Sequence, residues 1–167
     1  MPNWCNNSVT LTAASKEEAN ELYQHLQKQG EDGWSFFGFF FPEPDYEPNE
    51  GDAMPDWFWW RVNNWGTKWD ASIHQVDWID DLTCVMIFDT AWSPPLGIYD
   101  AMKEQGWVVF ASYYEPGMCF VGRWDDGDDE NYDYSNCNTG DEIREYLPEE
   151  LDMDWGISEY FDEALDD

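Results

Sequence analysis

Basic residues are scarce in this chain of 167 residues, which has 7 Lys and Arg against 37 Asp and Glu. The formal net charge at neutral pH is −30. Proteins hold nucleic acid phosphates and anionic lipid head groups mainly through Lys and Arg. The scarcity therefore argues against direct binding to nucleic acid or to a membrane surface, and favours partners with basic surfaces.

Long apolar runs and cysteine pairs are also missing. No stretch of about eighteen apolar residues is present, so no membrane span is predicted, and the N-terminus lacks the pattern of a signal peptide. Cys5, Cys84, Cys119 and Cys137 are widely separated, without CxxC or Cys/His spacing. We expect a soluble, reduced, cytoplasmic protein in which Cys84 and Cys119 are small core residues.

Signatures of catalysis are weak. The two histidines, His25 and His74, accompany no recognisable nucleophile motif, and we expect His25 at the surface of a helix. Phosphate-binding, dinucleotide-binding and zinc-protease motifs are absent. Carboxylates are so frequent that no single pair indicates glycosidase chemistry. The sequence therefore predicts a protein without enzymatic activity or cofactor, and a cation-dependent enzyme is the weakest alternative.

The acidic cluster at residues 125–133 raises the question of a calcium site. An EF-hand loop requires Gly at its sixth position and Glu six residues later. Here Gly127 comes too early, and Asp133 stands where the Glu should be. We therefore predict no metal site, and interpret the cluster as a solvated acidic turn or an interaction surface.

Aromatic residues are abundant, with 12 Trp, 9 Tyr and 10 Phe, and 43% of the chain is hydrophobic. Disordered acidic segments contain few aromatics. The composition therefore predicts a folded protein of single-domain size with a substantial core.

Apolar periodicity predicts an α+β fold. We expect strands at 6–13, 72–79, 82–89 and 107–114 and helices at 15–29 and 94–105. Their order matches the ferredoxin-like split βαβ arrangement, an antiparallel sheet with two helices on one face. A further strand at 118–125 should form a hairpin with 107–114. Leu22 and Ile87 are taken as core residues.

Two regions fall outside this pattern. Residues 31–71 form an aromatic-rich insert that is interrupted by prolines and predicted to be irregular. Residues 126–167 are predicted to form an acidic helical appendage, docked on a core that comprises residues 1–125. From residue 124 onward the chain has 18 of the 37 acidic residues and a single basic one, Arg144.

Four separated motifs resemble the YubB-type proteins of bacterial plasmids and phages. They are residues 1–7 (MPNWCNN), 64–70 (NWGTKWD), 88–95 (FDTAWSPP) and 114–118 (YEPGM). The resemblance covers about residues 1–125. It implies a ferredoxin-like fold and an origin in a mobile genetic element, and it implies no enzymatic activity.

Charge and resemblance together favour a non-enzymatic DNA mimic that inhibits a host nucleic-acid-binding protein with a basic groove. Its role would be anti-defence, such as anti-CRISPR or anti-restriction activity. Carboxylates would occupy the positions of phosphates. The predicted partner-binding residues are Asp125, Asp126, Asp128, Asp129, Glu130, Glu149, Glu150, Asp152 and Asp154. The alternative is a structural or accessory mobile-element protein whose charge serves only solubility.

A second candidate surface is the aromatic run that contains Trp57, Trp59 and Trp60. A base-stacking platform would need flanking cations, and only Arg61 and Lys68 are near. Core packing of the insert and an interface with a protein partner both remain open.

Overall fold

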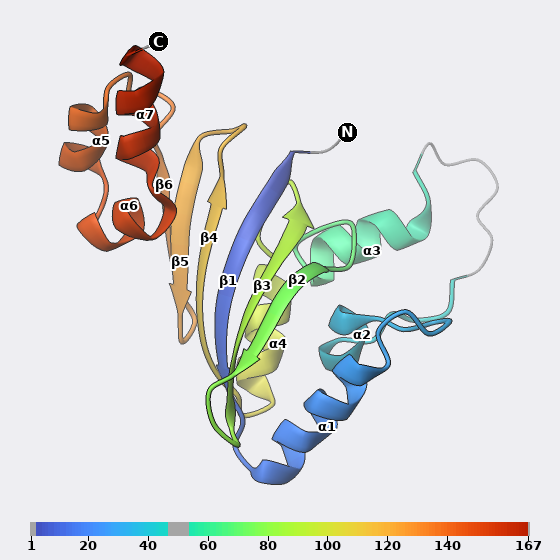
Figure 1. Ribbon diagram of the computed structural model, residues 1–167. Coiled ribbons are helices and arrows are strands. Elements are labelled where there is room, and N and C mark those ends of the chain that lie inside the picture. The colour runs from blue at the N-terminus through green and yellow to red at the C-terminus, as the bar shows by residue number, and fades with distance from the viewer. Residues whose placement is uncertain (1–2, 47–53, 167) are drawn as a thin grey trace.

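A six-stranded antiparallel sheet dominates the computed structural model, which describes residues 3–46 and 54–166 (Figure 1). The strands, in sheet order, are β2 (Ser72–Trp78), β3 (Thr83–Ala91), β1 (Trp4–Thr12), β4 (Val108–Glu115), β5 (Phe120–Asp125) and β6 (Asp128–Asp133). The helices are α1 (Lys16–Gln27), α2 (Phe36–Phe40), α3 (Asp56–Asn64), α4 (Leu96–Glu104), α5 (Gly140–Tyr146), α6 (Glu149–Trp155) and α7 (Ile157–Asp166). The α+β class is confirmed.

The six elements that periodicity predicted are all present, each within two residues of its expected ends. The expected hairpin is also present, since β5 pairs antiparallel with β4 from Phe110↔Asp125 to Glu115↔Phe120. Local signals account for this agreement. Ser15, for example, accepts a hydrogen bond from the Glu18 backbone N–H at 3.2 Å and so caps the start of α1.

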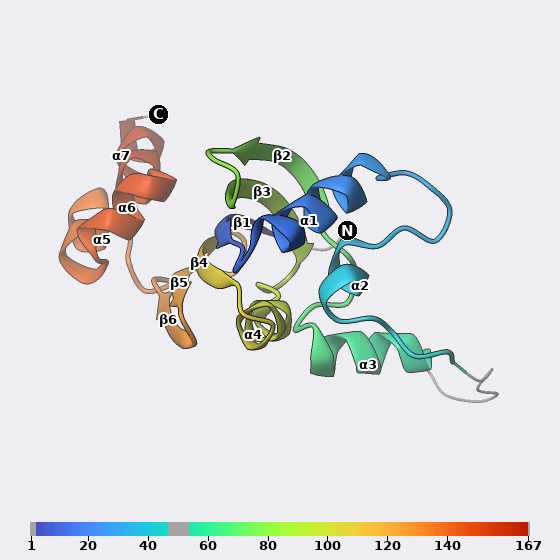
Figure 2. The same ribbon diagram turned by 90° about the horizontal axis from the view of Figure 1, so that it is seen from below.

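Helices α1, α2 and α4 lie on one face of the sheet, where the main core is found (Figure 2). Its fully buried side chains include Leu11, Leu22, Phe37, Phe88 and Met102. Gly97 allows α4 to approach the end of α3, because a Cβ there would collide with the Asn64 carbonyl oxygen. Cys84 is buried as predicted, but Cys119 is only partly buried.

The prediction of an irregular insert is wrong for its described residues, 31–46 and 54–71, because they contribute helices α2 and α3 to this core. Asp70 accepts hydrogen bonds from the backbone N–H groups of Phe36 and Phe37, both at 2.9 Å, and so fixes the start of α2. Trp65 is fully buried and donates from Nε1 to the Phe41 carbonyl at 2.9 Å. Aromatic packing and hydrogen bonds to a distant carboxylate position α2 and α3 despite the prolines near them.

The acidic residues 128–133 are not part of a helical appendage, because they form strand β6. The turn before it has Asp126 at φ 49° and Gly127 at φ 99°. Two central residues with positive φ are typical of a tight hairpin turn, for which Asp-Gly is a preferred pair. The prediction of a solvated turn holds for these two residues only.

Helices α5, α6 and α7 enclose a second, smaller core against β5 on the opposite face of the sheet from α4 (Figure 2). Its buried side chains are Val121, Tyr134, Ile143, Leu147, Leu151 and Ile157. Trp155 of α6 joins it to the sheet, since its Nε1 donates to Ser112 Oγ at 2.7 Å and its ring stacks on Tyr114.

Two single-residue predictions are wrong. Ile87 is not in the core, because its side chain points to the face opposite α1 and α4 and is 37% exposed. His25 is not simply a surface residue. Its ring stacks on Trp34 with centroids 5.1 Å apart, and its Nε2 lies 2.8 Å from the Ser35 carbonyl oxygen, so it ties α1 to the insert.

Candidate functional site

The sheet face that carries Ile87 has no helix over β1, β3 and the start of β4 among the residues that the structure describes (Figure 2). We call it the uncovered face. The register places Ser8 and Thr10 on it, between Ile87 on one side and Phe110 on the other. Phe110 is 44% exposed, and Val108, two residues earlier in β4, is 65% exposed. Exposed apolar side chains that gather on one face of a sheet are a feature of interaction surfaces.

A groove of about 310 Å³ lies between this face and α6. It is lined by Ser8, Thr10, Ile87, Phe110, Ser112, Asp154 and Trp155. The floor therefore combines apolar groups with hydroxyls, and α6 supplies a wall with one carboxylate. This chemistry suits an apolar side chain with a cation beside it.

Strand alternation divides the predicted acidic surface between two faces of the sheet. Asp125, Asp128 and Glu130 share the uncovered face, because β5–β6 pairing sets Asp125 opposite Asp128 and Arg123 opposite Glu130. Asp129 points to the other face, where its Oδ1 accepts from the Tyr113 hydroxyl at 2.6 Å. The nine predicted residues therefore do not form one continuous surface.

Several of the predicted carboxylates already have partners. Burial, and then the hydrogen bond to Asp129, raises the pKa of Tyr113 well above its ordinary value. Asp126 lies 3.5 Å from Lys103 Nζ. Arg123 joins Glu130 at 2.8 Å and Glu150 at 3.2 Å, and the hydrogen bond to Glu130 raises the pKa of this guanidinium.

Asp152 is wrongly placed among the partner-binding residues, because it is only 7% exposed. Its Oδ1 accepts from the Ser158 backbone N–H at 2.7 Å, and its Oδ2 accepts from the Ser158 hydroxyl at 2.6 Å. The carboxylate thus satisfies an N–H of the first turn of α7. Its role is to join α6 to α7.

Four predicted residues remain available to a partner: Asp125, Asp128, Glu149 and Asp154. We call them the four free carboxylates. All are exposed, and none has an ion pair or a side-chain hydrogen bond within residues 3–46 and 54–166. They come from the end of the β5–β6 hairpin and from α6, and Asp125 and Asp154 both adjoin Phe110.

The aromatic alternative is only partly exposed. Trp60 packs on Phe41 and Trp65, with ring centroids 5.4 and 5.8 Å apart. Trp57 is half-buried under the Arg61 guanidinium, 4.9 Å from the ring centroid. Trp59 is 55% exposed and is the member of the three that a partner could contact most fully.

An exposed aromatic cluster that the sequence analysis missed surrounds Lys68. The Lys68 Nζ lies 4.2 Å from the Trp69 ring centroid and 3.9 Å from that of Trp92, and Trp4 lies beside Trp69. Trp92 adopts φ 67°, an uncommon conformation for a bulky residue. The signal was present, since the three tryptophans belong to three of the four motifs quoted above.

These motifs meet through buried hydrogen bonds at one end of the sheet. Asn7 donates to Thr90 Oγ1 at 2.9 Å and accepts from the Tyr99 hydroxyl at 2.9 Å. Thr67 donates to the Ala91 carbonyl at 2.8 Å, and Ser93 donates to the Gly66 carbonyl at 2.6 Å. The motifs therefore build a structural junction, and their polar side chains are satisfied within it.

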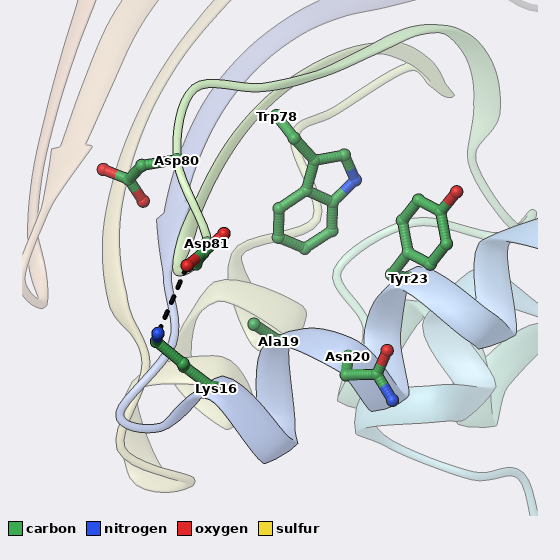
Figure 3. A pocket seen from close by; sticks show the side chains of 7 residues that line it. All are labelled: Lys16, Ala19, Asn20, Tyr23, Trp78, Asp80 and Asp81. Carbon is green, nitrogen blue, oxygen red and sulfur yellow. Dashed lines mark ion pairs between the residues drawn. The ribbon is translucent and has the colours of Figure 1, made fainter.

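A separate hollow of about 330 Å³ lies between α1 and the β2–β3 turn (Figure 3). Tyr23 and Trp78 form one side with ring centroids 6.1 Å apart, and Lys16 pairs with Asp81 at 3.3 Å on the other. Asp80 accepts from the Leu82 and Thr83 N–H groups, which lowers its pKa and shapes the turn. The polar groups here hold the turn in place.

No group of three or more His, Cys, Asp or Glu side chains in residues 3–46 and 54–166 could hold a metal ion. No helix in those ranges is both long enough and apolar enough to cross a membrane.

Comparisons with protein-family models, with curated proteins and with solved structures gave no match.

Proposed function

We propose that this protein is a non-enzymatic inhibitor that occupies the basic groove of a nucleic-acid-binding protein by mimicking DNA. The observation that carries the proposal is the surplus of carboxylate over available cation. Five of the seven Lys and Arg residues are engaged by the chain's own acids: Lys16, Arg61, Lys103, Arg123 and Arg144. Lys68 lies between two tryptophan rings.

The proposed mechanism is competition for the cations that normally hold phosphates. An exposed single charge contributes little, but an array that faces a basic groove acts together and steers association. Asp125 and Asp128 are directly opposite in the hairpin, and like charges so placed repel. A target Lys or Arg between them would replace that repulsion with two attractions, which favours a cationic partner at this place.

Fold family and origin belong to the same proposal. The antiparallel order β2-β3-β1-β4, with α1 and α4 on one face, supports a ferredoxin-like core of the split βαβ type. The resemblance of four motifs supports a YubB-type protein of a plasmid or phage. An anti-defence role in the bacterial cytoplasm, against a CRISPR effector or a restriction enzyme, follows from that origin and from the charge.

The proposal is tested by capture of proteins from a bacterial lysate on the immobilised full chain. Two competitors elute the column at equal concentration of charge: duplex DNA and polyglutamate. A DNA mimic predicts that duplex DNA releases the captured protein more effectively, because that protein has a groove shaped for phosphates. Equal release by polyglutamate would indicate nonspecific charge and would favour the accessory role in which charge serves only solubility.

A pair of matched variants locates the binding surface. One neutralises the four free carboxylates: Asp125→Asn, Asp128→Asn, Glu149→Gln and Asp154→Asn. The other removes four exposed charges elsewhere: Glu21→Gln, Glu31→Gln, Asp32→Asn and Asp45→Asn. The first variant should lose captured protein and show a flatter salt dependence, whereas the second should behave like the parent chain. Equal loss in both would contradict a localised DNA-mimicking surface.

A further inference from the structure

We propose that the uncovered sheet face is a docking site for an amphipathic helix of a partner protein, with an apolar stripe flanked by Lys and Arg. The inference goes beyond DNA mimicry, because it does not require a partner that binds nucleic acid. It rests on Ile87, Phe110, the groove beside α6 and the carboxylates around them.

The apolar part of the face lacks a second layer. A sheet is stable when its apolar face packs against another element, and α1, α2 and α4 provide that layer on one side only (Figure 2). On the other side, α6 covers Ser112 through Trp155 and stops short of Ile87 and Phe110. A partner can bury these two side chains without any rearrangement of the core.

The geometry favours a helix as the occupant. The backbone groups of β1, β3 and β4 on this surface are already paired within the sheet, so an added strand would find no main-chain partners there. The four strands β2, β3, β1 and β4, next to the part of the sheet that α6 covers, span about 14 Å at the usual strand spacing. A helix is about 10 to 12 Å wide with its side chains, so one fits between α6 and β2.

Charge selects a basic helix. Asp154 and Asp125 flank Phe110 on one side, with Asp128 beyond them, and Asp77 of β2 lies on the other side of the face. Arg123, the cation of β5 on this face, is held by Glu130 and Glu150. An approaching helix therefore meets carboxylates along both edges. A second copy of the chain, with a formal charge of −30, would be repelled.

The experiment uses a fluorescent model peptide of about eighteen residues, five helical turns, with Leu at i, i+3, i+4 and i+7 spacing and Lys elsewhere. A scrambled peptide of the same composition serves as the charge control. Fluorescence anisotropy measures binding to the full chain. We expect the amphipathic peptide to bind about tenfold more tightly than the scrambled one, because only its helix presents the apolar stripe.

Two variants separate the face from general attraction. The double substitution Ile87→Thr with Phe110→Thr should weaken binding of the amphipathic peptide about tenfold, since it removes the apolar contacts. Ile79→Thr, at a turn residue that is 65% exposed, is the matched control and should bind like the parent chain. Asp154→Asn should weaken binding more than Glu163→Gln, which removes one charge from α7.

A spectroscopic measurement on the parent chain guards against a variant that does not fold. The indole N–H signal of Trp155, which lines the groove, should shift when the amphipathic peptide is added.

Equal affinity for the scrambled peptide, equal binding by the Ile87/Phe110 and Ile79 variants, or an unmoved Trp155 signal would each overturn the proposal. Dimerisation of the parent chain that the double substitution abolishes would also overturn it, in favour of a second copy. If the chain captures no protein from the lysate that duplex DNA releases, but still binds the peptide, the proposed DNA mimicry is contradicted and the docking site is not.

Discussion

Asp125 and Asp128 lie directly opposite each other across the last residue pair of the β5–β6 hairpin, with no ion pair to either carboxylate in the described part of the chain. Like charges in this position destabilise a sheet. The hairpin closes all the same, because Asp126 and Gly127 adopt the positive φ values of its turn and Arg123 joins the strands through Glu130. The repulsion between Asp125 and Asp128 lowers the stability of the hairpin, and a cation of a partner protein bound between them would remove it.

The first prediction follows from this pair. Asp128→Asn should raise the free energy of unfolding by about 0.2 to 1 kcal/mol, because it removes the repulsion across the hairpin. Urea denaturation measures the change. Glu163→Gln, which removes one exposed charge from α7, is the control for the lower net charge. An equal gain in both variants would show that total charge, and not the cross-strand pair, limits stability.

The second prediction separates two apolar residues that the sequence analysis treated alike. Leu22 is fully buried under the sheet, and Leu22→Ala should cost about 2 to 5 kcal/mol because it leaves a cavity. Ile87 lies on the uncovered face, and Ile87→Ala should cost less than about 1 kcal/mol. Both values come from urea denaturation. A large loss for Ile87→Ala would mean that this face is covered in the free protein.

The third prediction concerns the carboxylate that was wrongly assigned to partner binding. Asp152→Ala should cost about 1 to 3 kcal/mol, since it leaves the buried Ser158 N–H and hydroxyl without their acceptor. Asp154→Asn, two residues later and exposed, should change stability by no more than about 0.5 kcal/mol. Thermal unfolding followed by circular dichroism compares them. Similar losses in both variants would contradict the structural role of Asp152.

Periodicity found the elements whose own side chains define a buried face. In β1, alternate residues from Cys5 to Leu11 are buried, and in α1 Ala19 and Leu22 share one side. Strand β6 has no such pattern, because its residues are Asp128–Asp133 and five of its six side chains are exposed. The Asp-Gly turn was visible in the sequence, but the strand after it depends on pairing with β5.

Contacts between distant residues explain the other differences. Ser35 caps α2 locally through the Gly38 N–H, but Asp70, which accepts from the Phe36 and Phe37 N–H groups, is 34 and 33 residues away, and this second acceptor could not be foreseen from residues 31–46. The exposure of Ile87 depends on which face α1 and α4 cover, and an alternating pattern does not state that. In the acidic segment, the residue type does not reveal whether a carboxylate caps a helix or is free. Asp152 and Asp154 could be told apart only after α6 and α7 were placed.

The fourth prediction concerns alkaline pH. Burial raises the pKa of Tyr99, Tyr113 and Tyr134 above the ordinary value of 10. The stability linked to their retained protons is therefore fully present below pH 10 and is lost as the pH rises above it. We expect the unfolding free energy to fall steeply there, with tyrosinate absorbance from these residues appearing only on unfolding. Tyr113→Phe should lessen the slope, whereas Tyr160→Phe, at a residue that is 65% exposed, should not.

The last prediction is that the chain does not bind DNA or RNA itself. Its formal charge of −30 repels phosphate, and five of its seven Lys and Arg residues are paired with its own acids. Fluorescence polarisation with labelled duplex DNA and single-stranded RNA should show no binding at micromolar concentrations and about 50 mM salt, where electrostatic attraction is stronger than at physiological salt. A chelator removes divalent cations that could bridge carboxylate and phosphate. Salt-sensitive binding near micromolar affinity under these conditions would rule out DNA mimicry, because a protein that presents carboxylates in place of phosphates must repel the polymer that it imitates.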